Sequence, residues 1–172
     1  MEKHLFNKTI LREYDIRGIV GKDLHFQDSL YLGKSFATYI KKLKLKNIVV
    51  GYDGRLASPK LHDALCKGLV DSGMQVTSIG MGPTPMVYFA HYYLKSDAAV
   101  MVTGSHNPPQ YNGFKMVLHH HSFFANNIKE LQHSDSMKTV QIGIYDELVK
   151  ELESRIETDS LILVKKDEQI SL

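Results

Sequence analysis

The chain alternates between short apolar runs and segments whose apolar residues recur every three or four positions. The short runs are typical of buried strands, and the recurring positions are typical of amphipathic helices. The predicted strands are 47–51, 75–79, 97–103 and 114–118, and the predicted helices are 28–43, 59–71, 85–94 and 126–132. Strands separated by helices pair in parallel through right-handed crossovers. The sequence therefore predicts an α/β fold in which helices cover both faces of a sheet.

Capping residues place the ends of two of these helices. Asp28 or Ser29 is a candidate N-cap for the first helix. In the second helix, Ser58 is the predicted N-cap, Pro59 occupies the first helical position, and Gly73 follows the end. A further helix is predicted from residue 144, followed by an apolar quartet at 161–164.

Composition excludes several classes of protein. Lys+Arg 21 against Asp+Glu 19 leaves a net charge of +2, which gives no electrostatic case for nucleic acid as a partner. No apolar run approaches the ~20 residues that span a bilayer, and residues 1–15 carry no secretory signal. The only cysteine, Cys66, forms no internal disulfide. We therefore expect a cytoplasmic protein without a membrane segment.

Residues that carry chemistry are expected where the parallel strands end. In open α/β sheets, ligands bind beyond the carboxyl ends of the strands. The loops after Val50, Ile79 and Val102 should meet there. The last of them, 103–115, is the densest polar segment, although a polar surface loop would have the same composition.

Two functions of these loops fail on the residues present. Ser105 and His106 are neighbours, and in an extended segment their side chains would point apart, so a direct nucleophile–base pair is not expected. The segment also lacks the Gly-x-Ser-x-Gly pattern of a nucleophile elbow. The glycines at 80 and 82 are followed by prolines, which rules out a dinucleotide-binding loop. A serine that carries phosphate instead needs cations nearby, which Arg17 and Lys115 could supply.

Two smaller patterns have structural explanations. Asp53 and Arg55 could orient a loop or bind a phosphate, but a local ion pair that fixes the turn is the favoured explanation. A metal site on His119, His120 and His121 is a third kind of function. Adjacent histidines rarely converge on one ion, so we expect exposed loop residues there.

Four segments together resemble the α-D-phosphohexomutase family, in its phosphomannomutase/phosphoglucomutase branch. They are Glu13-Tyr14-Asp15-Ile16-Arg17-Gly18, Gly51-Tyr52-Asp53-Gly54-Arg55, Gly82-Pro83-Thr84-Pro85 and Thr103 to Lys115. The resemblance runs from about Tyr14 to about Ile156. It implies the family's first domain, a three-layer helix–sheet–helix sandwich with a mostly parallel mixed sheet. It assigns residues 1–140 to that domain, and 141–172 to a linker helix and the start of a second domain.

The resemblance also implies roles for residues. Ser105 matches the phosphoserine that exchanges its phosphoryl group with a hexose 1- or 6-phosphate of mannose or glucose. The bisphosphate formed in the site acts as intermediate, and a hexose 1,6-bisphosphate as activator. Arg17 and Lys115 match the basic residues that flank the transferred group, and His106 and Asn107 match residues that shape the serine loop. The other positions implied for the substrate or phosphate loop are Tyr14, Thr103, Gly104 and Asn112.

The family's other signatures are not found in these 172 residues. In the family, Mg²⁺ bridges the phosphate on the serine and three aspartates of an Asp-Gly-Asp-Gly-Asp loop, and this chain has no such loop. The Mg²⁺ site would then hold only the phosphate of Ser105, and we expect little turnover by the chain alone. We expect a separate chain to carry the remaining domains, and partner binding or self-association to cover the face that normally meets the second domain. The alternative function is that of a non-catalytic remnant or anion-binding domain.

Overall fold

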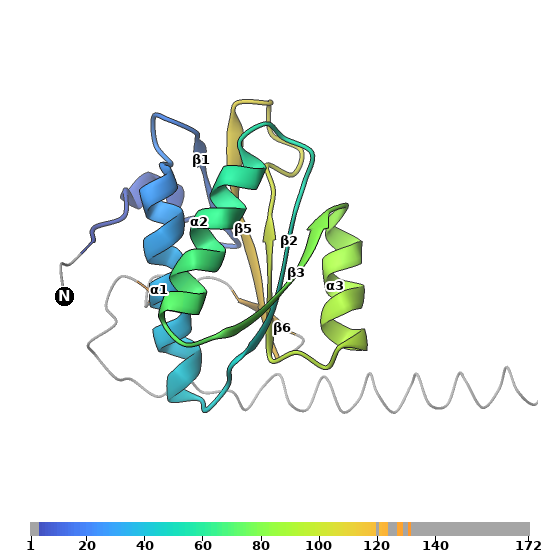
Figure 1. Cartoon of the computed structure of the whole chain (residues 1–172). Helices are drawn as coiled ribbons and strands as arrows, with labels where there is room; N and C mark the ends of the chain where they lie inside the picture. Colours follow the sequence, from blue (N-terminus) through green and yellow to red (C-terminus); the bar gives the residue numbers. More distant parts are fainter. Residues whose placement is uncertain (1–3, 120, 124–126, 129–130, 132–172) are drawn as a thin grey trace, which may run out of the picture. The chain divides into compact units, whose positions relative to one another are not determined.

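The structure, a computed structural model, describes residues 4–119, 121–123, 127–128 and 131. Six strands form one sheet in the order β1-β5-β4-β2-β3, with β6 also paired to β5 (Figure 1). The strands are β1 (Ile16–Ile19), β2 (Asn47–Tyr52), β3 (Gln75–Met81), β4 (Ala98–Val102), β5 (Tyr111–Leu118) and β6 (His121–Phe123). β2 runs parallel to β3 and β4, and the other three pairings are antiparallel. The predicted mixed sheet is confirmed, with a smaller parallel part than expected.

Three helices cover the two faces of this sheet. α1 (Phe26–Lys42) and α2 (Ser58–Asp71) lie side by side on one face, and α3 (Thr84–Tyr93) lies on the other (Figure 1). A short 3₁₀ helix, η1 (Lys8–Ile10), precedes β1. The predicted helix–sheet–helix sandwich is therefore confirmed. None of the helices in this described part is long and apolar enough to cross a membrane.

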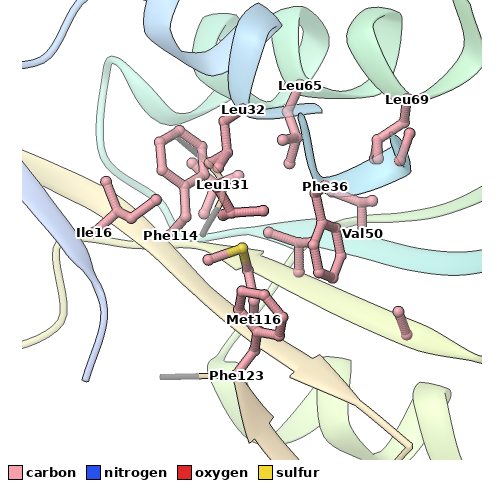
Figure 2. Close-up of a cluster of buried hydrophobic side chains, with 14 of the residues drawn as sticks. Ile16, Leu32, Phe36, Val50, Leu65, Leu69, Phe114, Met116, Phe123 and Leu131 are labelled. Atoms are coloured by element: carbon pink, nitrogen blue, oxygen red, sulfur yellow. The ribbon is translucent and has the colours of Figure 1, made fainter. Parts of the chain in front are cut away.

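The core divides into two clusters because side chains alternate along each strand. On β5, Phe114 and Met116 belong to the large cluster beneath α1 and α2, with Phe36 and Leu65 of those helices (Figure 2). Val117 belongs to the smaller cluster beneath α3. The alternation decides where the polar residues of β1 and β5 project, which matters for the site below.

α1 and α2 approach each other closely through two glycines. A Cβ on Gly33 would lie 2.4 Å from the carbonyl oxygen of Leu65, and one on Gly68 would lie 2.1 Å from that of Leu30. Both distances are far below ordinary contact, so the helices pack backbone to backbone at this point. The Oγ of Ser29 also donates a hydrogen bond across the contact, to the carbonyl of Leu61.

The two predicted N-caps are wrong, for a physical reason in each case. α1 begins earlier, at Phe26, with His25 as N-cap. Asp28 lies in the first turn, where its carboxylate accepts the His25 backbone N–H at 2.7 Å. α2 has Ala57 as N-cap, and Ser58 is already helical because its hydroxyl binds Asp53 instead of capping.

Some predictions concern residues outside those described. The helix predicted at 126–132 is described only at 127, 128 and 131, and the helix and strand predicted after residue 144 lie wholly outside. The domain boundary predicted at residue 140 therefore stays a prediction. β1 is a strand that the sequence patterns did not predict.

Candidate active site

Three loops meet at the carboxyl ends of the parallel strands, as the sequence predicted. The N–H of Asp53, just after β2, donates to the carbonyl of Val102 at 2.9 Å. The N–H of Gly82, just after β3, donates to the carbonyl of Tyr52 at 2.9 Å. These bonds fix the loop after β2 to the ends of its two neighbours. The segment that follows β4, residues 103–110, is called the serine loop below.

Asp53 binds the beginning of the serine loop. Its Oδ2 accepts the hydroxyl of Thr103 at 2.9 Å and the backbone N–H of Gly104 at 3.0 Å. Its Oδ1 accepts the hydroxyl of Ser58 and the backbone N–H of Arg55. Burial raises the pKa of this carboxyl, but the hydrogen bonds from Ser58, Thr103 and the two backbone N–H groups outweigh it and hold the pKa below 3.8. Asp53 is therefore a charged structural anchor.

Ser105 lies at the outer part of the loop in a left-handed backbone conformation, with φ of 52°. Its backbone N–H donates to the Thr103 hydroxyl at 2.8 Å, which fixes this conformation. The residue is half-buried, so its hydroxyl is not part of the core. A residue in this region projects its side chain from a tight bend, which makes the oxygen reachable from outside.

The bend also brings Ser105 and His106 together. The Oγ of Ser105 lies 3.3 Å from Nδ1 of His106. The expectation that these neighbouring side chains point apart is wrong, because it assumed an extended backbone. His106 is exposed to solvent.

Arg17 projects from β1 beneath the serine loop. Its side chain is 1% exposed, its Nη1 donates to the carbonyl of Thr103 at 2.8 Å, and its Nη2 is paired with Asp15. The Nε–H is buried without a hydrogen-bond acceptor among the described residues. Arg17 thus forms an ion pair with Asp15 and also supports the serine loop.

Lys115 lies on the same face of the sheet as Arg17. Arg17 is paired with Gly113, and Lys115 comes two residues later on β5. Ile16 and Phe114 both point into the large core, so the alternation places Arg17 and Lys115 on the opposite face as diagonal neighbours. Two cationic side chains thus come from β5, which pairs with β4, and from β1 on the far side of β5.

Arg55 is the functional candidate that the sequence patterns left as a local ion pair. That pair exists, with Nε 3.2 Å from Oδ2 of Asp53. The rest of the guanidinium crosses to the serine loop and the start of β5, where it donates to four backbone carbonyls. They belong to Ser105, Asn107, Pro108 and Tyr111. Because these acceptors are backbone carbonyls, the sequence does not show which residues Arg55 binds. Only the Asp53-Gly54-Arg55 turn drew attention to this residue.

The remaining candidates lie at different depths. Asn107 donates its backbone N–H and its Nδ2 to the carbonyl of Gly104, closing the loop on itself. Asn112 is fully buried, and its Nδ2 donates to the Oγ of Ser58 at 2.8 Å, so it supports the loop from beneath. Tyr14 precedes β1 with a side chain that is 72% exposed.

The residues present do not make a Mg²⁺ site by themselves. Mg²⁺ prefers carboxylate and phosphate oxygens in octahedral geometry. The acidic side chains at the site, Asp53 and Asp15, already accept hydrogen bonds from Arg55 and Arg17 and from the loop. No group of three or more His, Cys, Asp or Glu side chains that could hold a metal is found within the described residues. His119 and His121 are among the residues searched, and His120 lies outside the described residues.

Comparison with known proteins gives consistent results. A family profile described as "Phosphoglucomutase/phosphomannomutase, alpha/beta/alpha domain I" matches residues 8–134. A phosphoglucomutase of Neisseria gonorrhoeae is 44% identical over 124 residues, covering 72% of this chain and 27% of that protein. A phosphomannomutase/phosphoglucomutase of Pseudomonas syringae pv. tomato is 34% identical over 166 residues, covering 92% of this chain and 35% of that protein.

A solved structure has the same fold. The crystal structure of a phosphoglucomutase/phosphomannomutase family protein from Burkholderia thailandensis superposes with a TM-score of 0.71 at 38% identity. The match covers 75% of this chain and 30% of that one. The chain thus spans about a quarter to a third of the length of the proteins it resembles.

Proposed function

The chain belongs to the phosphoglucomutase/phosphomannomutase family, and from this premise we propose that Ser105 accepts and returns a phosphoryl group. The donor and acceptor are a hexose 1- or 6-phosphate of mannose or glucose and the corresponding 1,6-bisphosphate. In this proposal the described domain supplies the phosphoserine of a phosphohexomutase. The observation that carries it is a reachable serine hydroxyl at a bend that hydrogen bonds hold in place.

The proposed step exchanges one phosphorus–oxygen bond for another. The Oγ of Ser105 forms a bond to phosphorus as the bond between phosphorus and the sugar oxygen breaks. The hydroxyl proton passes to Nδ1 of His106, 3.3 Å away, and the sugar oxygen takes a proton from water. The sugar that donates in this step is the 1,6-bisphosphate, which is left as the 6-phosphate. In the reverse step the phosphoserine passes its phosphoryl group to the 6-hydroxyl of a hexose 1-phosphate, which regenerates the bisphosphate and the Ser105 hydroxyl. The sum of the two steps converts a 1-phosphate into a 6-phosphate.

The protein's contribution is positioning and charge. Phosphoryl transfer passes through a loose transition state whose charge is spread over peripheral oxygens, so fixed cations lower its energy. Arg17 and Lys115 supply these cations. A serine phosphate brings about −1.5 to −2 charges at neutral pH, which two cations would largely balance. The Nε–H of Arg17, buried without an acceptor in the described part, is a donor that an anion nearby would satisfy.

The test is phosphorylation of the full chain by glucose 1,6-bisphosphate and by mannose 1,6-bisphosphate, in buffer containing Mg²⁺. Intact-mass measurement should show the gain of one phosphoryl group, and peptide mapping should place it on Ser105. The variant Ser105→Ala should gain none. A matched control, Ser122→Ala, removes an exposed hydroxyl on β6 and should be labelled like the unmodified chain. No label under conditions that label a full-length relative, or a label elsewhere, contradicts the proposal and favours a non-catalytic anion-binding domain.

Turnover is a separate measurement, since the chain spans only part of its relatives' length. We expect a coupled assay with mannose 1-phosphate or glucose 1-phosphate to detect mutase activity when a second chain carrying the rest of a relative is added with Mg²⁺. We expect little activity without that chain, because the described carboxylates do not complete a Mg²⁺ site. Robust activity from the 172 residues alone would show that the site is complete by another arrangement.

A further inference from the structure

We propose that Arg55 is the positioning residue that holds the serine loop in its phosphoryl-accepting shape. The inference rests on the proposed role of Ser105 and adds a residue that does not itself touch the substrate. It predicts that the planar geometry of the guanidinium, and not its charge alone, sets the rate at which Ser105 is phosphorylated.

The guanidinium of Arg55 uses its whole donor capacity within the protein. Arginine has five N–H donors, and the side chain makes five hydrogen bonds. Nε donates to Asp53, Nη1 to the carbonyls of Pro108 and Tyr111 at 2.7 and 3.1 Å, and Nη2 to those of Ser105 and Asn107 at 3.0 and 2.7 Å. The side chain is 17% exposed. No N–H is left for a phosphate, so Arg55 acts on the reaction through the loop.

The acceptors lie on both sides of the bend that carries Ser105. The carbonyl of Ser105 itself is bonded, and the peptide bond after it is trans, as is every described peptide bond. The N–H of His106 therefore points away from the guanidinium. Two of the other acceptors, Asn107 and Pro108, precede prolines, so their peptide units offer a carbonyl and no N–H. Arg55 thereby fixes the direction of the loop's peptide groups and keeps Ser105 in its left-handed conformation.

Gly104 shows how closely the guanidinium fits the loop. A Cβ at this position would lie 2.1 Å from both Cζ and Nε of Arg55. The absence of a side chain is what lets the guanidinium lie against the residue before the serine. Asp53 anchors both partners, since it accepts Nε of Arg55 and the backbone N–H of Gly104 on the same oxygen. The serine loop and Arg55 are thus both bound to the carboxylate of Asp53.

The test compares Arg55→Lys with the unmodified full chain. Lysine keeps the charge but has three donors on a single nitrogen and cannot reach the four carbonyls together. We expect the rate of Ser105 phosphorylation by glucose 1,6-bisphosphate to fall by at least about tenfold, since a misplacement of 1 Å can cost ~10²-fold. The matched control is Arg12→Lys, the same change at an exposed arginine before β1, which should keep the unmodified rate.

Chemical rescue separates positioning from folding. In Arg55→Ala, added methylguanidinium should restore part of the phosphorylation rate, and methylammonium at equal concentration should not. A loss that is due only to lower stability would respond to neither ion, and it would appear as a lower unfolding temperature. Phosphorylation of Arg55→Lys at the unmodified rate, measured below its unfolding temperature, would overturn the inference.

The inference can fail separately from the proposed function. If the unmodified chain is not phosphorylated, the proposed role of Ser105 is wrong, and the positioning role is decided by amide hydrogen exchange. Faster exchange across 104–111 in Arg55→Lys than in Arg12→Lys, with α2 unchanged, would support a loop held by the guanidinium. Equal exchange in the two variants would refute it.

Discussion

Replacing Gly68 by alanine should destabilise the protein, although helix propensity alone predicts the opposite. An alanine in a helix interior is about 1 kcal/mol more favourable than a glycine. At Gly68, however, the new Cβ would lie 2.1 Å from the carbonyl oxygen of Leu30, about 1.3 Å short of the 3.4 Å at which ordinary contact begins. The two effects have opposite signs, so the direction of the change identifies which one dominates.

The size of the destabilisation depends on which atoms around the new Cβ can move. The obstacle is the backbone of α1, so no rotation of a side chain relieves the overlap, and the helices must separate by roughly 1 Å. A gap of that size removes about a quarter to a half of the dispersion attraction between facing atoms. Overpacking costs about 1–3 kcal/mol, and a rigid obstacle places this site at the upper end. After the gain in propensity, Gly68→Ala should lower the free energy of unfolding by about 2 kcal/mol.

Urea denaturation followed by circular dichroism measures this change. With a slope of about 1–3 kcal/mol per molar urea, the midpoint should fall by roughly 1 M. The matched control is Lys67→Ala, the adjacent residue, whose side chain is 66% exposed and makes only a surface ion pair with Asp71. Its effect should stay within about 0.5 kcal/mol. A Gly68→Ala variant as stable as the unmodified chain, or more stable, would refute the close backbone contact between α1 and α2.

Two further outcomes are expected. Gly104→Ala should lower the free energy of unfolding by about 1–3 kcal/mol, because the new Cβ displaces a guanidinium that five hydrogen bonds hold, and it should lower Ser105 phosphorylation at least about tenfold in the mass assay. Because the pKa of Asp53 is lower in the folded than in the unfolded chain, its contribution to stability is present above the ordinary value of 3.8 and lost as pH falls through the folded pKa. Urea titrations below pH 4 should therefore show a steeper loss for the unmodified chain than for Asp53→Asn; parallel curves would contradict this.

The helices and parallel strands could be predicted because their signals are local. The apolar stripe of α1 and the apolar run of β2 can each be recognised as buried from their own residues, without reference to the rest of the chain. The loops at the carboxyl ends of β2, β3 and β4 could be expected to meet because parallel pairing fixes which ends lie together. The helix–sheet–helix layers followed from the same alternation of strands and helices, whereas no strand register was predicted.

Antiparallel parts of the sheet carried weaker signals. β5 begins at Tyr111, and its first residues were predicted as loop because Asn112 is polar. Asn112 is nevertheless buried, and its amide binds Ser58, a partner 54 residues away in sequence. β1 has four residues, one of them a buried arginine, so neither its length nor its composition indicates a strand. In both β5 and β1, contacts with residues that are distant in the sequence determine the structure.

At the site, the sequence singled out Ser105 and two basic residues as candidates, but not the contacts that hold them. Side-chain types revealed Ser105, Arg17 and Lys115. The left-handed backbone of Ser105 has no local signal in a residue other than glycine, and the contact with His106 depends on it. Orientation of a loop by Arg55 was one possibility from the sequence, but a local ion pair was favoured, because the acceptors of Arg55 are peptide carbonyls, which every residue has.

The contacts of the serine loop with β1 and β5 also determine when a nascent chain can give this loop its final shape. Arg17 leaves the ribosome 86 residues before Thr103, whose carbonyl it binds in the finished fold. At about 5–20 residues per second this interval lasts roughly 4–17 s, and the edge of β4 that β5 will cover is open until β5 emerges. The serine loop can take its final shape only when the carbonyls of Gly113 and Tyr111 arrive to accept Thr103 N–H and Arg55. The serine loop is therefore synthesised before the strand that completes its hydrogen bonds, and it takes its final shape only after β5 has been made.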